Sequence, residues 1–218
     1  FKEGEEVGLL GARAFMERDP VAARVDTLLN FEARGVTGPA LMFETSRPDA
    51  AAIGLYARPV ARPAGNSLAA DFARLIPNST DVAVLKERDW TILNFAIIGN
   101  ETRYHSPGDT LAALDPRSLQ HMGDQALALA RDGGTPVDGT GSVNYTDLLG
   151  RTIVVIPTPM AAAALALLLI GAAAAAWRRR RDLGRAAATV TVTLLGSAAL
   201  AFAAQGTLQL PRDGDYWR

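Results

Sequence analysis

The chain has 218 residues, with 22 Lys and Arg against 23 Asp and Glu, so its formal net charge at pH 7 is −1. A protein without a basic surplus has no electrostatic footprint for a phosphate backbone, which excludes nucleic acid as a partner. The absence of cysteine excludes disulfides and thiolate metal sites, so any metal must be held by His, Asp or Glu. The chain begins at Phe1 with neither a charged leader nor an apolar signal segment, and we expect it to be part of a longer protein.

The first 150 residues have the pattern of an α/β domain. Apolar residues at helical spacing predict a first helix over residues 8–16. Further helices are predicted from Ser46 to about Ala57 and over residues 67–75. Short apolar runs predict buried strands, the last of them central, at residues 27–31, 40–43 and 91–98.

The end of this domain is marked by a change in composition. Asp115 and Pro116 have the pattern of an N-cap followed by a proline in the first turn, which predicts a helix to about Ala130. Residues 132–145 are rich in Gly, Thr and Asp. We therefore predict that residues 1–131 belong to the folded domain and that residues 132–159 form a linker beside the membrane.

Two uncharged, Ala-rich stretches follow. Residues 160–177 form a run of 18 residues without a charge, which spans about 27 Å as a helix. Trp177 stands at its end, where an interfacial aromatic residue is expected, and four arginines follow at positions 178–181. The second stretch covers residues 186–210. A pair of soluble helices is the alternative, but a charge-free run beside four arginines suits a soluble core poorly, so we predict two transmembrane helices.

The arginines also predict the topology. A short basic loop over residues 178–185 stays in the cytoplasm under the positive-inside rule. The domain and the tail at residues 211–218 then both lie on the non-cytoplasmic side. Neither span contains Asp, Glu, Lys or Arg, which favours membrane anchors over the alternative of a transporter or assembly subunit.

Acidic and imidazole side chains lie where a ligand site is expected. Glu5 and Glu6 open the first predicted helix, Glu32 ends the first predicted strand, and His105 follows the central strand. Ligand sites in open α/β sheets form at the carboxyl ends of strands. Each residue alone is more often a solvated surface side chain, but together they provide potential zinc ligands at one edge.

Three segments in order carry a resemblance. The chain is similar to metallopeptidase family twenty-eight, the co-catalytic zinc aminopeptidases, and most similar to its membrane-bound branch of the vacuolar membrane protease and endoplasmic-reticulum metallopeptidase type. That resemblance covers residues 1–130 and implies a mixed, mostly parallel sheet flanked by helices, present here incompletely. Its motifs are Gly4-Glu5-Glu6-Val7-Gly8, Asn30-Phe31-Glu32-Ala33-Arg34-Gly35 and Tyr104-His105-Ser106-Pro107-Gly108-Asp109-Thr110.

The resemblance implies a role for five residues. Glu5 would be the general base, Glu6 and His105 would bind one zinc, and Glu32 would bind the other. Tyr104 would stabilise the developing oxyanion. Two zinc ions would together activate a water that attacks a peptide bond, and the expected partners are peptide substrates and the lipid bilayer.

One departure limits this expectation. The family's His-x-Asp motif belongs upstream of the Glu5-Glu6 segment and is absent from this chain, so we expect the chain alone to be inactive within an active parent peptidase. The alternative is a non-catalytic ectodomain that acts as a receptor or binding module. His121, inside the predicted helix that follows Pro116, is expected to be structural.

Overall fold

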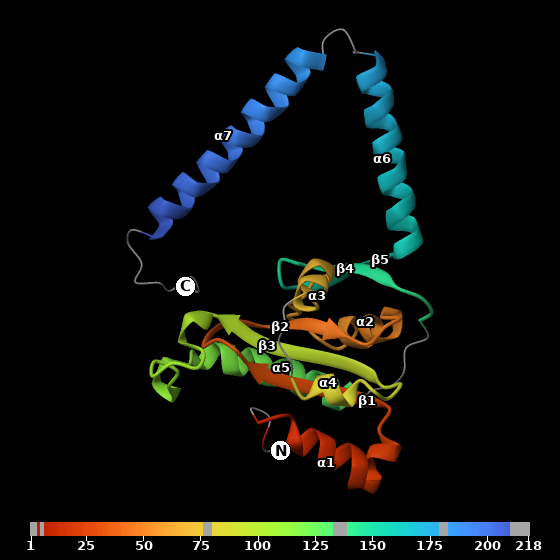
Figure 1. Cartoon of the computed structure of the whole chain (residues 1–218), viewed down its shortest axis with the longest axis vertical. Helices are drawn as coiled ribbons and strands as arrows, with labels where there is room; N and C mark the ends of the chain where they lie inside the picture. The colour runs from red at the N-terminus through yellow and green to blue at the C-terminus, as the bar shows by residue number, and fades with distance from the viewer. Residues whose placement is uncertain (1–3, 5–6, 76–79, 133–138, 179–182, 210–218) are drawn as a thin grey trace. The chain divides into compact units, whose positions relative to one another are not determined.

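A computed structural model describes residue 4 and residues 7–75, 80–132, 139–178 and 183–209. The chain divides into two units, Phe1–Thr158 and Pro159–Arg218, and each is considered by itself. The first unit is an α/β domain (Figure 1). The second consists of two helices, α6 and α7.

The centre of the first unit is a three-stranded sheet with the order β1-β3-β2. The strands are β1 (Thr27–Ala33), β2 (Thr37–Thr45) and β3 (Thr91–Gly99), all within the predicted apolar runs or extending them. The prediction that the third run is central is confirmed. The prediction of a mixed sheet is confirmed, because β1 pairs with β3 in parallel and β2 pairs with β3 antiparallel, but the described strands are not mostly parallel.

The direction of β2 follows from a short connection. Only residues 34–36 separate β1 from β2, and parallel strands need a crossover of about a dozen residues or more. The chain therefore reverses at Gly35, whose backbone N–H donates to the carbonyl of Ile97 at 2.7 Å. A Cβ atom at this position would lie 2.2 Å from the carbonyl oxygen of Gly99, so the turn requires glycine.

Helices cover the two faces of the sheet unequally. On one face, α2 (Ala50–Ala57) and α5 (Pro116–Asp132) pack over Leu93 and Phe95. Phe95 is fully buried, with its ring stacked on Phe31 and set edge-on against Tyr56 at centroid distances of 4.8 and 5.6 Å. On the other face, α1 (Leu10–Arg18) and α4 (Val82–Leu85) cover Leu28 and Ile92 in a second core cluster.

The remaining short elements of this unit connect the sheet to its helices. The helix α3 (Ser67–Ala73) lies against β2, and Asn66 caps it by accepting a hydrogen bond from the N–H of Ala69 at 2.8 Å. The described part of the unit also contains the 3-10 turns η1 (Pro20–Arg24), η2 (Glu101–Arg103) and η3 (Leu111–Ala113). The helices predicted at residues 46–57, 67–75 and 115–130 correspond to α2, α3 and α5.

A β-hairpin lies inside the interval that was predicted as a linker. It consists of β4 (Val143–Leu148) and β5 (Thr152–Pro157) and belongs to the first unit. Val143 and Tyr145 of β4 are buried in the core cluster around Phe95. The linker prediction is wrong here, because the polar residues that alternate with them hide the strand from a search for continuous apolar runs.

The second unit contains α6 (Thr158–Arg178) and α7 (Leu183–Gln209). Among the described residues, α6 is the one helix that is long and apolar enough to cross a membrane. The predicted span at residues 160–177 lies within it. In α7 the apolar stretch is shorter, Ala187–Leu200. The described residues therefore support the first of the two predicted membrane spans and not clearly the second.

Candidate functional site

The carboxyl ends of β1 and β3 lie at the same edge of the sheet, because these strands are parallel. Glu32 is opposite Ala96 in the register, two residues before Arg34. The Nε atom of Arg34 lies 3.3 Å from a carboxylate oxygen of Glu101, which follows β3. This ion pair joins the ends of the two strands beside Glu32.

Tyr104 and His105 lie in the loop at this edge. Their rings stack with centroids 3.8 Å apart, and the guanidinium carbon of Arg34 lies 5.4 Å from the centroid of the Tyr104 ring. His105 has a φ of 53°, a left-handed conformation that is uncommon for a residue other than glycine. Both side chains are exposed, so they are accessible to a ligand at the surface.

A chain of amide hydrogen bonds holds the Glu32 carboxylate. The amide nitrogen of Asn30 donates to Oε1 of Glu32 at 2.7 Å and to Oδ1 of Asn94 at 2.9 Å. The amide nitrogen of Asn94 in turn donates to Oε2 of Glu44 at 3.0 Å and lies 3.4 Å from Oγ1 of Thr80. One buried and one half-buried amide therefore connect a carboxylate on β1 with a carboxylate on β2.

These two asparagines were missed in the sequence analysis, although a signal for them exists. β1 begins Thr-Leu-Leu-Asn-Phe and β3 begins Thr-Ile-Leu-Asn-Phe, so each strand places one asparagine at the same position within an apolar run. The parallel register aligns Asn30 with Asn94. Asn94 has no exposed surface, and a buried amide needs partners for its polar atoms.

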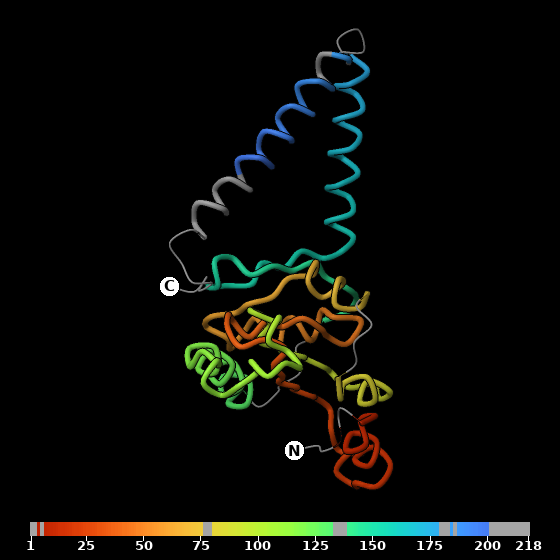
Figure 2. Tube along the Cα trace, turned by 60° about the vertical axis from the view of Figure 1, so that its left-hand side comes forward, coloured from red at the N-terminus to blue at the C-terminus, as the bar shows by residue number. Residues whose placement is uncertain are grey.

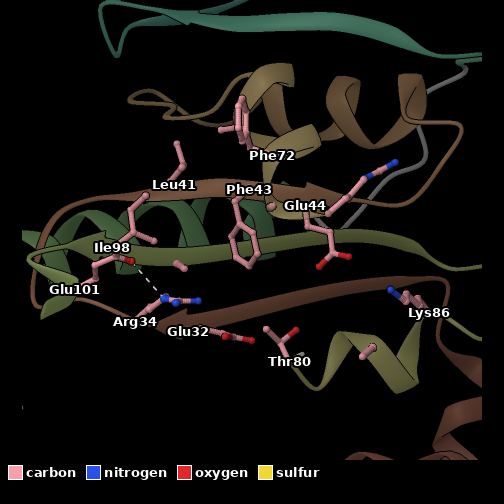
Figure 3. Close-up of a pocket in the computed structure, with 15 residues that line it drawn as sticks. Glu32, Arg34, Leu41, Phe43, Glu44, Phe72, Thr80, Lys86, Ile98 and Glu101 are labelled. Atoms are coloured by element: carbon pink, nitrogen blue, oxygen red, sulfur yellow. Dashed lines mark ion pairs between the residues drawn. The ribbon is translucent and has the colours of Figure 1, made fainter. Parts of the chain in front are cut away.

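A cavity of about 450 Å³ opens on this polar face of the sheet (Figure 3). Its volume is within the range of small-molecule and peptide side-chain pockets, roughly 300–1,000 Å³. The walls are apolar in the middle and charged at both ends. The apolar wall comprises Leu41, Phe43, Phe72 and Ile98; one end has Glu32, Arg34 and Glu101, and the other has Glu44, Arg74 and Lys86.

The predicted metal ligands are only partly described. Glu5 and Glu6 lie outside the described residues. Glu32 and His105 have the donor types that zinc accepts, but the described ranges contain no group of three His, Asp or Glu side chains that could hold a metal. The described residues alone therefore do not form a complete metal site, and the roles of all five predicted residues stay predictions.

His121 has a structural role, as predicted. Its Nδ1 accepts a hydrogen bond from the N–H of Ala40 at 3.1 Å, and its Nε2 lies 2.9 Å from the carbonyl oxygen of Arg62. Because a carbonyl can only accept, Nε2 carries the hydrogen and the ring is neutral. Burial lowers the pKa of His121, which is consistent with this neutral form.

The sequence is similar to a known peptidase family and to named membrane proteases. A family profile described as "Peptidase family M28" matches residues 1–130. The chain is 30% identical over 161 residues to a vacuolar membrane protease of Eremothecium gossypii, covering 71% of this chain and 16% of that protein. It is 26% identical over 168 residues to endoplasmic reticulum metallopeptidase 1 of Mus musculus, covering 72% of this chain and 19% of that protein. No solved structure gives a significant match.

A third relative is also named a vacuolar membrane protease. The chain is 34% identical over 130 residues to a vacuolar membrane protease of Scheffersomyces stipitis, covering 58% of this chain and 13% of that protein. In each of these three alignments the matched region is less than a fifth of the relative's own length.

Proposed function

The chain belongs to peptidase family M28, as its three motifs predicted, and on that premise we propose that the protein is a membrane-anchored, zinc-dependent peptidase of the aminopeptidase type. The observation that carries this proposal is the shared edge of β1 and β3. There Glu32, near the end of β1, lines the cavity, and the Tyr104-His105 pair lies in the loop after β3, with the Tyr104 ring beside Arg34. These residues belong to two of the three motifs.

The proposed roles follow the motifs. Glu5 would be the general base, Glu6 and His105 would bind one zinc, Glu32 would bind a second, and Tyr104 would face the developing oxyanion. Bound zinc would supply Lewis-acid polarisation of the scissile carbonyl and lower the pKa of a water. The chain's own contribution is visible at Glu32, whose carboxylate is oriented by the amide of Asn30.

The cavity supports a peptide as the substrate. Its apolar wall, with Phe43 and Phe72 among its members, would bury an apolar side chain next to Glu32. The carboxylates of Glu32 and Glu101 at the same end favour a cationic group, such as the free amine of a peptide N-terminus. This arrangement favours removal of an apolar N-terminal residue over cleavage inside a chain.

The proposed topology rests on the basic loop. Helices at residues 160–177 and 186–210 would cross the membrane, residues 178–185 would face the cytoplasm, and the domain of residues 1–131 would lie on the non-cytoplasmic side with the tail at residues 211–218. The support is the apolar length of α6 and the arginine at its end. The membrane location named for two groups of relatives agrees with an anchored protein.

A second candidate function is a peptide-binding module without catalysis. It is favoured by the cavity itself, whose apolar wall and charged ends could hold a peptide without a metal. The peptidase and the binding module would both hold a peptide in the cavity, but only the peptidase would need bound zinc.

The test measures zinc content and peptide hydrolysis on the intact protein in detergent. We expect about two zinc ions per protein and hydrolysis of a peptide with a free N-terminus, but not of the same peptide after N-acetylation. His105→Ala should lower both zinc content and rate, while the zinc-free forms of the variant and of the unchanged protein should have the same melting temperature, because His105 is exposed. His121→Ala is the control: it should lower the melting temperature and leave zinc content unchanged. A folded protein that binds peptide without zinc would replace the peptidase with the binding module.

A further inference from the structure

The β4–β5 hairpin has an uncharged surface on the side turned away from the core, where each cross-strand pair joins one polar and one apolar side chain. Alternate residues of β4 point to opposite faces, and Val143 and Tyr145 face the core. The opposite face carries the cross-strand pairs Asn144–Ile156, Thr146–Val154 and Leu148–Thr152. We call these six residues, together with Leu149 at the turn, the outer face of the hairpin.

The outer face is uncharged and substantially exposed. Ile156 is 44% exposed, Val154 40% and Leu148 54%. The nearest acidic residue, Asp147, has its carboxylate engaged with the backbone, since Oδ1 accepts from the N–H of Gly65 and Oδ2 from that of Gly150. An uncharged surface with exposed apolar side chains of this kind is suited to contact with a membrane or with another protein.

The turn of the hairpin breaks two local rules at one residue. Leu149 is 87% exposed, and its φ of 54° is left-handed. With Gly150 at a φ of 62° and a hydrogen bond from the N–H of Arg151 to the carbonyl of Leu148, the turn is one in which Asn or Gly is the usual first residue. A leucine at this position has an unfavourable backbone conformation and exposes an apolar side chain. Contact of the Leu149 side chain with water is therefore unfavourable.

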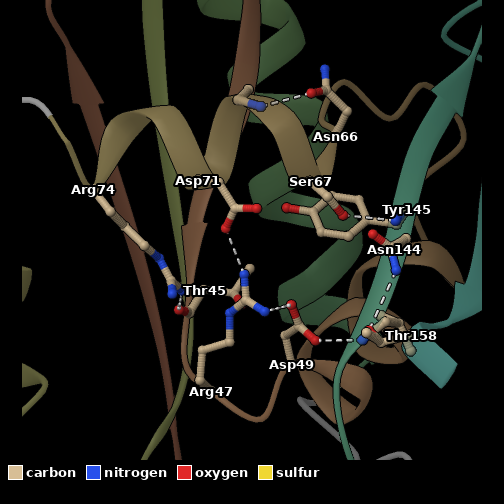
Figure 4. A network of polar contacts seen from close by, with 12 residues as sticks. Thr45, Arg47, Asp49, Asn66, Ser67, Asp71, Arg74, Asn144, Tyr145 and Thr158 are labelled. Carbon is tan, nitrogen blue, oxygen red and sulfur yellow. Dashed lines mark hydrogen bonds and ion pairs between the residues drawn. The ribbon is translucent and has the colours of Figure 1, made fainter. Parts of the chain in front are cut away.

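The hairpin is mounted firmly on the domain (Figure 4). The N–H of Val143 donates to Oδ1 of Asp49 at 2.8 Å, and that of Tyr145 donates to Oγ of Ser67 at 2.8 Å. The inner edge of β4 is thus occupied by α2 and α3, and β5 forms the outer edge. The outer face is therefore a fixed surface of the first unit.

The chain passes directly from the hairpin into the candidate membrane span, as the trace in Figure 2 shows. β5 ends at Pro157 and α6 begins at Thr158, with no residue between them. Thr158 is itself bonded to the hairpin, because its N–H donates to the carbonyl of Ser142 at 3.1 Å and its Oγ1 lies 3.4 Å from the amide nitrogen of Asn144. When α6 crosses the membrane, the hairpin starts at the lipid surface.

We propose that the outer face of the hairpin lies in the lipid interface and docks the domain on the bilayer. The proposal rests on the membrane anchoring by α6 and is independent of peptidase activity. Ile156 lies two residues before α6, and the tip at Leu149 is about 20 Å along the strand. Docking at both ends of β5 would hold the first unit against the membrane instead of leaving it free to swing on a single helix.

The test uses the absence of cysteine from the chain, which lets a single introduced cysteine carry a label. Leu149→Cys and Ile156→Cys in the intact protein are labelled with an environment-sensitive fluorophore in vesicles that contain lipids with a nitroxide near the headgroup. Leu111→Cys is the matched control, because Leu111 is 86% exposed and lies in η3, away from the hairpin. Leu168→Cys, within α6, reports the span itself.

We expect nitroxide to reduce the fluorescence at positions 149 and 156 about twofold or more relative to position 111, since an interfacial apolar face enters roughly 5–10 Å into the headgroup region. Equal quenching at 149, 156 and 111, with position 168 quenched by a deep nitroxide, would overturn the docking and leave the anchor standing. Loss of quenching at position 168 as well would overturn both the anchor and the docking.

Discussion

The two faces of the central sheet differ in what they bury. The face with Leu93 and Phe95 is apolar and is closed by α2 and α5. The face with Asn30 and Asn94 is mixed: α1 and α4 cover a second apolar cluster at one part of it, and beyond α4 it carries the amide chain and opens into the cavity beside Glu32. The first face therefore contributes packing alone, whereas the second combines packing with charged groups in a fixed arrangement.

The largest expected loss of stability comes from removing a large side chain from the apolar face. Phe95→Ala removes a fully buried ring that stacks on Phe31 and contacts Tyr56, and it should lower the free energy of unfolding by about 3–5 kcal/mol. Urea unfolding of the protein in mild detergent, followed by tryptophan fluorescence, measures the loss. Ile98→Ala is the control on the same strand, because Ile98 is 42% exposed and faces the cavity. Equal losses in the two variants would remove the distinction between the faces.

A smaller effect is expected on the polar face. Asn94→Ala deprives Asn30 and Glu44 of a buried partner and should cost about 1–3 kcal/mol of unfolding free energy. It should also weaken zinc binding, because Asn30 would then be free to turn away from Glu32. Zinc titration beside urea unfolding separates the two results, with Asn144→Ala as the exposed control. Undiminished zinc affinity would show that the amide chain serves stability alone.

The apolar face also contains two tyrosines whose ionisation is suppressed. Burial raises the pKa of Tyr56 and of Tyr145 well above the ordinary value for a phenol. The unfolded chain therefore releases these protons first, so stability is constant below pH about 10 and falls as the pH rises beyond it, by up to about 1.4 kcal/mol per pH unit for each tyrosine.

Unfolding measured from about pH 8 to about pH 11, on both sides of the ordinary phenol pKa of roughly 10, checks this. Tyr145→Phe should flatten the alkaline decline while losing one weak contact, that of its hydroxyl with Met42. Tyr56→Phe should also flatten it but start from a lower stability, since the Tyr56 hydroxyl accepts from the N–H of Ala64 and donates to Oε1 of Gln125. An unchanged alkaline slope in both variants would contradict the assignment.

The smallest effect is expected at the open edge. Glu101→Gln weakens the ion pair with Arg34, in which the side chains are 62% and 36% exposed, and should change the unfolding free energy by less than about 1 kcal/mol. The same variant removes a carboxylate from the charged end of the cavity, so the KM for a peptide with a free N-terminus should rise. A stability loss as large as that of Asn94→Ala would place Glu101 among the buried network groups instead.

Much of the fold could be predicted from local pattern. Apolar runs located β1, β2 and β3, and Asp115 with Pro116 marked the start of α5, because strand and helix periodicity act over a few residues. The three motifs identified the family, and the charge-free run located α6. Glu32 and His105 were also placed at the ends of strands by sequence order alone.

Contacts between distant segments were decided only by the tertiary structure. The pairing of Asn30 with Asn94 needs a parallel register across 64 residues, and the direction of β2 needs the reversal at Gly35. The hairpin was missed because β4 buries alternate residues against helices far away in the sequence. The sequence by itself determined which segments are apolar, since that is a property of each residue. The structure decided which of them meet, because register and chain direction depend on the whole chain at once.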